Sequence, residues 1–371
     1  MKFGFWLCAS FLAAAVRSAE PVLTDGDTTW LVRGTAAQRA MLHTCREAKT
    51  PLAADMEYQN GCLLLNDDKG GCFAALNTHG VVMTVSNGDP NSDPEPPASA
   101  QPPDVSRLPA ALLPSCETAR QAAEEVQKLF DAGRISGGRI FFFADAGRAF
   151  IVECSSRHFA KWELNRAFCV YANSWKLPGM DEASTAPARR AYTLYQKEWA
   201  AREVLRRRYE AERGISAAAS IAASRLNADD LNGDDYRQAR DPADGKSRLE
   251  IAQHHAHSAG GFLFEIDAEF PGMLSCVYAA FGAPRSTIHL PVPLGAASAL
   301  PKGTVTSAGT PEKVDPKLVE FESSLLAEFG RVHEEARKLL RGGRSGEAAQ
   351  LLRDTLSKQT AAAGDFLRKA R

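Results

Sequence analysis

The sequence predicts an α+β protein in which antiparallel sheets are packed by helices. Segments with strand character follow one another in hairpins, and helical segments come between groups of strands and at the C-terminal end. Because strands and helices do not alternate regularly, a doubly wound parallel sheet is not expected. The chain has 371 residues, 44% of them hydrophobic, which is enough to bury a sizeable core.

The first residues have the features of a signal peptide. Met1 and Lys2 supply a charged end, residues 3–16 form a short apolar run, and small residues follow. Because that run is too short to span a bilayer comfortably, we expect export, not an integral membrane span. Residues 1–19 are therefore predicted to be a signal peptide that is cleaved near Ser18 or Ala19, and the protein to be secreted or periplasmic.

Charge and cysteine content exclude several classes of protein. The net charge of -1 gives no sign of a nucleic-acid partner. Seven cysteines remain after the signal peptide, an odd number with irregular spacing and no Cys-x-x-Cys pair, so neither a small disulfide scaffold nor a zinc or redox motif is expected. No glycine-rich phosphate loop is present, and no cofactor is predicted.

The strands are predicted from apolar runs and hairpin turns. Residues 70–87 read as a two-stranded hairpin that ends in Asn87-Gly88, and the six prolines of residues 90–103 predict a loop after it. Residues 139–144 and 148–153 form a second hairpin around a short polar turn. Further short strands are expected at residues 31–32, 51–54, 168–172, 261–267, 274–281 and 288–292.

Three helical regions are predicted from apolar spacing. Residues 115–130 form one helix with Ser115 as its cap, and residues 189–223 form a heavily charged one. Residues 316–341 and 345–370 form a helical pair that breaks at Gly342-Gly343, within a C-terminal helical extension over residues 300–371. That pair could pack against a second chain as easily as against its own sheet, so a homo-oligomer remains open.

Six segments of the chain form a recognisable set of motifs. They are Thr44-Cys45, residues 51–58, the hairpin 71–87, residues 143–153, Tyr171-Ala172-Asn173-Ser174 and residues 275–284. Taken together, they resemble the acyl-coenzyme A:6-aminopenicillanic acid acyltransferase-like and bile-salt-hydrolase-like branch of the N-terminal-nucleophile hydrolases. The resemblance covers roughly residues 45–295. It implies a four-layer αββα sandwich over residues 45–299, no cofactor, and hydrolysis or acyl transfer at a linear amide bond of a small molecule.

In that family a cysteine at the start of the mature chain attacks the amide carbonyl, its own α-amine acts as base, and amide groups hold the oxyanion. By its position Cys45 is the first candidate nucleophile, which makes residues 20–44 a prosegment that self-processing would remove. The resemblance assigns the remaining roles as follows: Asp55 or Glu57 orients the amine, Asn87 and Asn173 hold the oxyanion, and Arg189 or its neighbour Arg190 supports the nucleophile.

Three alternatives stay open. Cys72 is a rival nucleophile, because Gly71-Cys72 is similar to the self-cleavage bond of the acyltransferases. The chain is otherwise an exported ligand-binding relative that has lost the nucleophile, since polar residues follow Cys45 and the carboxylates at positions 55–57 replace the asparagine and arginine of the family. The third alternative is a hydrolase that uses a metal at the histidines of residues 254–257.

Overall fold

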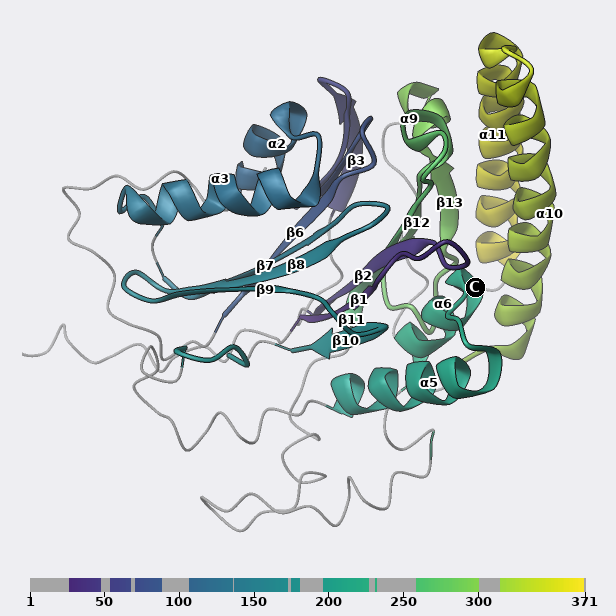
Figure 1. The fold of residues 1–371 in the computed structure, drawn as a ribbon. Coiled ribbons are helices and arrows are strands. Elements are labelled where there is room, and N and C mark those ends of the chain that lie inside the picture. The colour runs from purple at the N-terminus through teal and green to yellow at the C-terminus, as the bar shows by residue number, and fades with distance from the viewer. Residues whose placement is uncertain are drawn as a thin grey trace, which may run out of the picture.

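The structure is a computed structural model, and it describes residues 27–47, 54–67, 71–88, 107–135, 137–172, 175–180, 196–226, 231, 258–299 and 314–369. Two antiparallel sheets lie face to face, and helices cover both outer faces (Figure 1). The predicted four-layer αββα sandwich is therefore confirmed.

The seven-stranded sheet is a meander, because its strands are neighbours in space in the same order as in the sequence. The first hairpin turns at Asn60 and Gly61, which both have positive φ angles (51° and 75°), as a two-residue turn between antiparallel strands requires. In order, the strands are β3 (Ala54–Gln59), β4 (Cys62–Asp67), β5 (Cys72–Asn77), β6 (Val82–Asn87), β7 (Arg139–Ala144), β8 (Ala149–Cys154) and β9 (Phe159–Glu163).

The six-stranded sheet joins distant parts of the sequence. At its centre, the second strand of an N-terminal hairpin pairs with a strand from the last third of the chain. In this pairing Cys45 lies opposite Gly261. Residues 27–44, the described part of the predicted prosegment 20–44, contribute one whole strand and much of another. Across the sheet the order is β10 (Phe168–Tyr171), β1 (Thr28–Val32), β2 (Ala40–Glu47), β11 (Ser258–Ile266), β12 (Cys276–Phe281) and β13 (Leu290–Pro293).

Two helices on the outer face of the seven-stranded sheet bury a stripe of alanines and aliphatic residues against β5 to β8. They are α2 (Leu108–Leu112) and α3 (Ala119–Asp131). The predicted helix start at Ser115 is wrong. Ser115 belongs to the short turn η2 (Leu113–Ser115), and Thr118 caps α3 by accepting a hydrogen bond from the backbone N–H of Gln121 (3.1 Å).

The single helix predicted over residues 189–223 is two helices in the described part of the chain. These are α5 (Gln196–Glu212) and α6 (Ala217–Arg225), which pack on the outer face of the six-stranded sheet. Arg213 has a positive φ of 53°, which ends the first helix, and the Ser216 hydroxyl caps the second by accepting from the N–H of Ala219 (3.1 Å).

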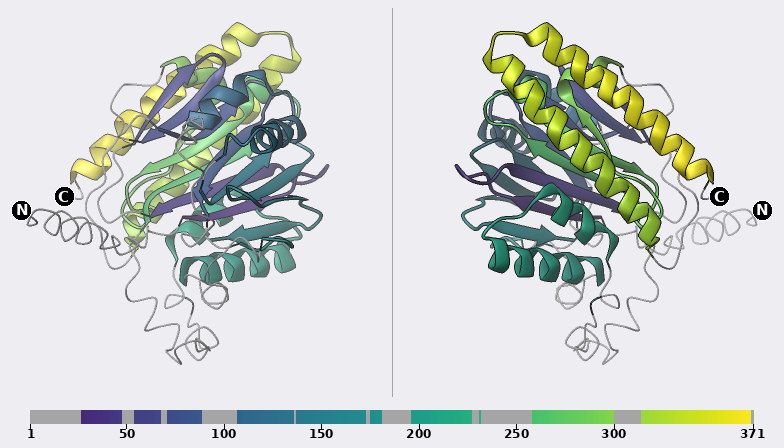
Figure 2. Two further views of the ribbon diagram at one scale, coloured as in Figure 1. Left: turned by 90° about the vertical axis from the view of Figure 1, so that its left-hand side faces the viewer. Right: turned by 90° about the vertical axis from the view of Figure 1, so that its right-hand side faces the viewer.

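The C-terminal helical pair is confirmed as α10 (Pro316–Arg341) and α11 (Ser345–Lys369), joined at Gly342 and Gly343. Figure 2 shows the two helices lying antiparallel along one side of the sandwich. Their apolar faces join the core between the sheets through β13 and the short η5 (Leu294–Ala299), beside the one-turn helix α9 (Pro271–Leu274). The pair is therefore a part of this fold.

Candidate functional site

Cys45 lies in the middle of the six-stranded sheet. In β2 it is paired with Thr28 on one side and with Gly261 on the other. Its side chain is fully buried in the cluster that α5 and α6 cover, on the face turned away from the other sheet. A chain that began at Cys45 would lack β1 and much of β2, so this position does not favour a terminal nucleophile.

Cys72 begins β5 and packs beneath α2, in the cluster on the outer face of the seven-stranded sheet. Its Sγ lies 3.2 Å from the carbonyl oxygen of Ala74. Burial raises the pKa of this thiol to about 12, against an ordinary value of 9.0. Because the thiolate is the nucleophilic form, the raised pKa does not favour Cys72 as a nucleophile at neutral pH.

Of the other predicted residues, those that the structure describes do not gather around Cys45. Asp55 and Glu57 are exposed on β3, the edge strand of the seven-stranded sheet, whereas Cys45 belongs to the six-stranded one. Asn87 is exposed at the end of β6. Asn173, Arg189 and Arg190 lie outside the described residues, so their predicted roles remain predictions.

The structure instead brings together an ion pair between the two sheets. Asp27, directly before β1, is 5% exposed, and its Oδ2 lies 2.5 Å from Nη1 of Arg46 on β2. The same nitrogen donates to the carbonyl oxygen of Val85 on β6 (3.1 Å), and the guanidinium lies over the ring of Phe73 on β5 (4.7 Å). Arg46 thus links the start of β1, in the six-stranded sheet, to β5 and β6 of the seven-stranded sheet.

Further polar groups lie on the inner faces near this pair. The hydroxyls of Thr29 and Thr44 are 3.0 Å apart between β1 and β2. The hydroxyls of Thr84 and Ser86 on β6 and the indole N–H of Trp175 are buried and make no hydrogen bond within the described part of the chain. Buried polar groups usually have partners, so these are candidates to contact a ligand.

Sequence reasoning missed this ion pair. Arg46 is one of the polar residues after Cys45 that weaken the case for a nucleophile there. Leu42, Thr44 and Arg46 nevertheless alternate toward the inner face of the sheet, as strand residues do. That alternation was the available signal. Asp27 gave none, because its partner lies on the neighbouring strand, and that pairing was not predicted.

Glu153 is a buried carboxylate that holds the segment after β10 against the seven-stranded sheet. It accepts hydrogen bonds from the backbone N–H of Lys176 (2.8 and 3.0 Å) and of Leu177 (3.0 Å). Burial raises its pKa to about 7 and outweighs these hydrogen bonds, which favour the charged form. A proton at Glu153 therefore stabilises this part of the fold.

We expect Glu153→Gln to change how stability depends on pH. The carboxyl group has its ordinary pKa of 4.5 when unfolded and about 7 when folded, so its favourable contribution is complete below pH 4.5 and is lost as pH rises to about 7. Across that window the wild type should lose on the order of 3 kcal/mol more stability than the variant. Urea unfolding at several pH values measures this difference in stability.

Glu163→Gln, at an exposed position, is the control. Superimposable stability profiles for Glu153→Gln and wild type would contradict the assignment.

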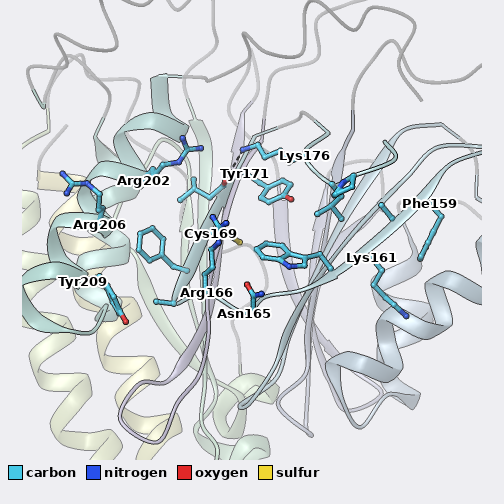
Figure 3. Close-up of a pocket in the computed structure, with 17 residues that line it drawn as sticks. Phe159, Lys161, Asn165, Arg166, Cys169, Tyr171, Lys176, Arg202, Arg206 and Tyr209 are labelled. Carbon is cyan, nitrogen blue, oxygen red and sulfur yellow. Dashed lines mark hydrogen bonds between the residues drawn. The ribbon is translucent and has the colours of Figure 1, made fainter. Parts of the chain in front are cut away.

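A cavity of about 1110 Å³ opens between the edge strands β9 and β10, with α5 beside it (Figure 3). Tyr171, Lys176 and Leu177 line it, and Glu153 accepts hydrogen bonds from the backbone of the last two. Its size suits a small organic molecule. It is therefore a candidate binding site.

One buried cluster has the spatial arrangement of a hydrolase triad, with Ser224 beside His289 and His289 beside Glu322. Ser224 Oγ is 3.5 Å from Nε2 of His289, and Nδ1 of His289 is 3.1 Å from Oε1 of Glu322. All three are buried, and Ser224 donates its proton to the carbonyl oxygen of Ile221 (2.7 Å). Arg225 holds the same Glu322 oxygen at 2.6 Å, so this cluster fastens α6 and α10 to the sheet.

The metal hypothesis rests on histidines at residues 254–257, which lie outside the described residues. Among the residues that the structure does describe, no group of three or more His, Cys, Asp or Glu side chains could hold a metal ion. In the described part of the chain, none of the helices combines the length and the apolar composition of a membrane-spanning segment.

No profile of a known protein family matches the chain, and no curated protein sequence does either. Among solved structures it is similar to a Caenorhabditis elegans orthologue of N-acylethanolamine-hydrolyzing acid amidase, at 10% identity and a TM-score of 0.40 over 66% of this chain and 93% of that one. Penicillin V acylase from Agrobacterium tumefaciens shows 11% identity and a TM-score of 0.36, over 68% and 86% of the two chains. A mutant of the conjugated bile acid hydrolase from Clostridium perfringens shows 8% and 0.40, over 67% and 88%.

The last of these proteins is named as a bile acid hydrolase, and bile-salt hydrolases belong to the group that the sequence motifs resemble. Identities of 8–11% transfer no residue role to this chain. The chemistry of this chain therefore has to follow from its own residues.

Proposed function

We propose that this protein is an exported ligand-binding protein that uses the sandwich of amide hydrolases without a cysteine nucleophile at its N-terminus. The position of Cys45 carries the proposal. A terminal nucleophile needs a free α-amine and open space for the substrate carbonyl. Cys45 has strands paired on both sides and a fully buried side chain.

Asp27, which directly precedes β1, supports the same proposal. Its carboxylate pairs with Arg46, and its side chain has no thiol or hydroxyl group that could take part in acyl transfer. Cys72 is buried with a raised pKa. The cavity between β9 and β10 gives the protein a place for a ligand that needs no reaction.

The N-terminal residue of the natively exported protein tests this proposal. Intact mass and terminal sequencing should give a chain that begins near Ala19 or Glu20 and stays that length on storage. Cys45→Ala should have the same N-terminus as the wild type. Cys276→Ala, at a buried cysteine in the same helix-covered cluster, controls for the loss of a buried sulfur.

The competing function is a cysteine amide hydrolase or acyltransferase that processes itself. A mature chain beginning at Cys45 or at Cys72, together with loss of that processing when the same cysteine is changed to alanine, would establish it and overturn the binding proposal. Small linear amides would then be the substrates to screen.

A further inference from the structure

The cavity between β9 and β10 has a strongly unequal charge distribution. Five cationic side chains line it, and none of the lining residues is acidic. The cations come from the edge strand β9, the turn between β9 and β10, the segment after β10 and helix α5 (Figure 3). They are Lys161, Arg166, Lys176, Arg202 and Arg206.

Nearby carboxylates neutralise only part of this charge. Lys176 and Arg202 share one carboxylate, since both contact Oε1 of the buried Glu198 (2.5 Å for Lys176 Nζ). Arg206 is matched by Glu203 (2.7 Å) and Glu210 (2.8 Å). The carboxyl group of Glu153 also interacts with the charge of Lys176, whereas the shared Glu198 is the only described counter-charge of Arg202.

Two more lining cations have no acidic partner within the described part of the chain. Arg166 is exposed in the turn before β10 and forms no salt bridge there, and Lys161 donates to the amide oxygen of Gln127 (2.9 Å). The Arg166 guanidinium, which has no described acidic partner, is well suited to a carboxylate or phosphate. It can bind such a group with two parallel hydrogen bonds.

The walls of the cavity are aromatic. Trp162 and Tyr171 reach it from the core between the sheets, and the ammonium group of Lys176 lies 4.6 Å from the centre of the Tyr171 ring. Phe159, Phe168 and Tyr209 complete the lining, each of them partly buried. Such surfaces favour a large apolar body, while the cations favour a negative charge on it.

We propose that this cavity binds an organic anion with an aromatic or alkyl body, with its anionic group at Arg166 and its apolar body against Trp162 and Tyr171. This inference rests on the proposed function, which it deepens by naming the class of ligand. The charge selects the ligand, and the aromatic walls supply most of the contact area.

Isothermal titration calorimetry of the full exported protein tests it with decanoate as the probe, below its critical micelle concentration. Decanoate should bind at one site. Decylammonium, which has the same chain and the opposite charge, and inorganic phosphate, which has no apolar body, should both bind at least roughly tenfold more weakly. Equal binding of decylammonium, or of phosphate, would overturn the proposal.

Two variants locate the site. Arg166→Glu should weaken decanoate roughly tenfold or more, whereas Arg331→Glu makes the same charge change on α10, at another exposed arginine without a described salt bridge, and should leave the affinity unchanged. Ala167→Trp, which fills the cavity, should also weaken binding while circular dichroism shows an intact fold. Wild-type affinity in both cavity variants would overturn the assignment.

The two proposals fail in different ways. If decanoate does not bind while the mature chain begins near Ala19, the ligand class is wrong and the binding function stands. If the chain begins at Cys45 and small amides are cleaved, the binding function fails whatever decanoate does.

Discussion

Asp27→Ala should lower the free energy of unfolding by about 3 kcal/mol, at the lower end of the range for breaking a buried ion pair. The change leaves the Arg46 guanidinium between the sheets with the Val85 carbonyl and the Phe73 ring as its remaining described contacts. Arg46 keeps 21% of its side chain exposed, so water offsets some of the loss. Denaturant unfolding at neutral pH measures the effect.

The double variant Asp27→Ala/Arg46→Met separates the pair from its surroundings. Removing both charges should restore part of the stability, because the methionine keeps apolar contact with Phe73 without a buried charge. Asp354→Ala, on the outer side of α11, is the surface control and should change stability by less than about 0.5 kcal/mol. An Asp27→Ala protein as stable as this control would show that the pair contributes nothing.

Glu322→Gln should destabilise the protein by about 3 kcal/mol or more, because Glu322 is the counter-charge of the buried Arg225 and also accepts from the backbone N–H of His289 (2.6 Å). For a chain of 371 residues the melting temperature should fall by about 4 °C or more. Glu328→Gln is the matched control on the same helix. Glu328 pairs with Lys358 at the surface (2.7 Å), and its loss should cost within about 1 kcal/mol.

The acid limb of the stability profile provides a second readout for Glu322. Burial by itself would raise its pKa, but the hydrogen bond from His289 and the charges of His289 and Arg225 outweigh burial and hold the pKa at about 2. Its contribution is therefore complete above its ordinary pKa of 4.5 and is lost as pH falls toward 2. Glu322→Gln should flatten that part of the curve. A wild-type acid limb in this variant would contradict the role given to Glu322.

Local patterns in the sequence predict much of this fold. The hairpins β5–β6 and β7–β8 and the helices α10 and α11 follow from turns, apolar alternation and glycine breaks within a short stretch of chain. Strand β2 was missed because its C-terminal half is polar. Polar residues are accommodated there because β1 places Asp27 beside Arg46, and because β11 pairs with the other side of the strand.

The candidate site was harder to predict for the same reason. Each predicted residue was placed by its order along the chain, whereas the groups that meet come from separate strands. Cys45 and Arg46 are adjacent in sequence, but alternation along a strand sends one side chain under the helices and the other between the sheets. A one-residue difference therefore separates a buried thiol from the polar cluster, and sequence order alone does not show which of the two lies inside.

The different connectivities of the two sheets have a consequence for how this protein folds. Every neighbouring pair in the seven-stranded sheet is made by consecutive strands, so it needs only residues 54–163 and, apart from the β6–β7 connection, short loops. The six-stranded sheet has to wait for residues 258–266, because β11 is the strand that pairs with β2. We expect the meander to form early and to act as the surface on which the six-stranded sheet is assembled, and β2–β11 pairing, with its long loop closure, to set the pace of folding.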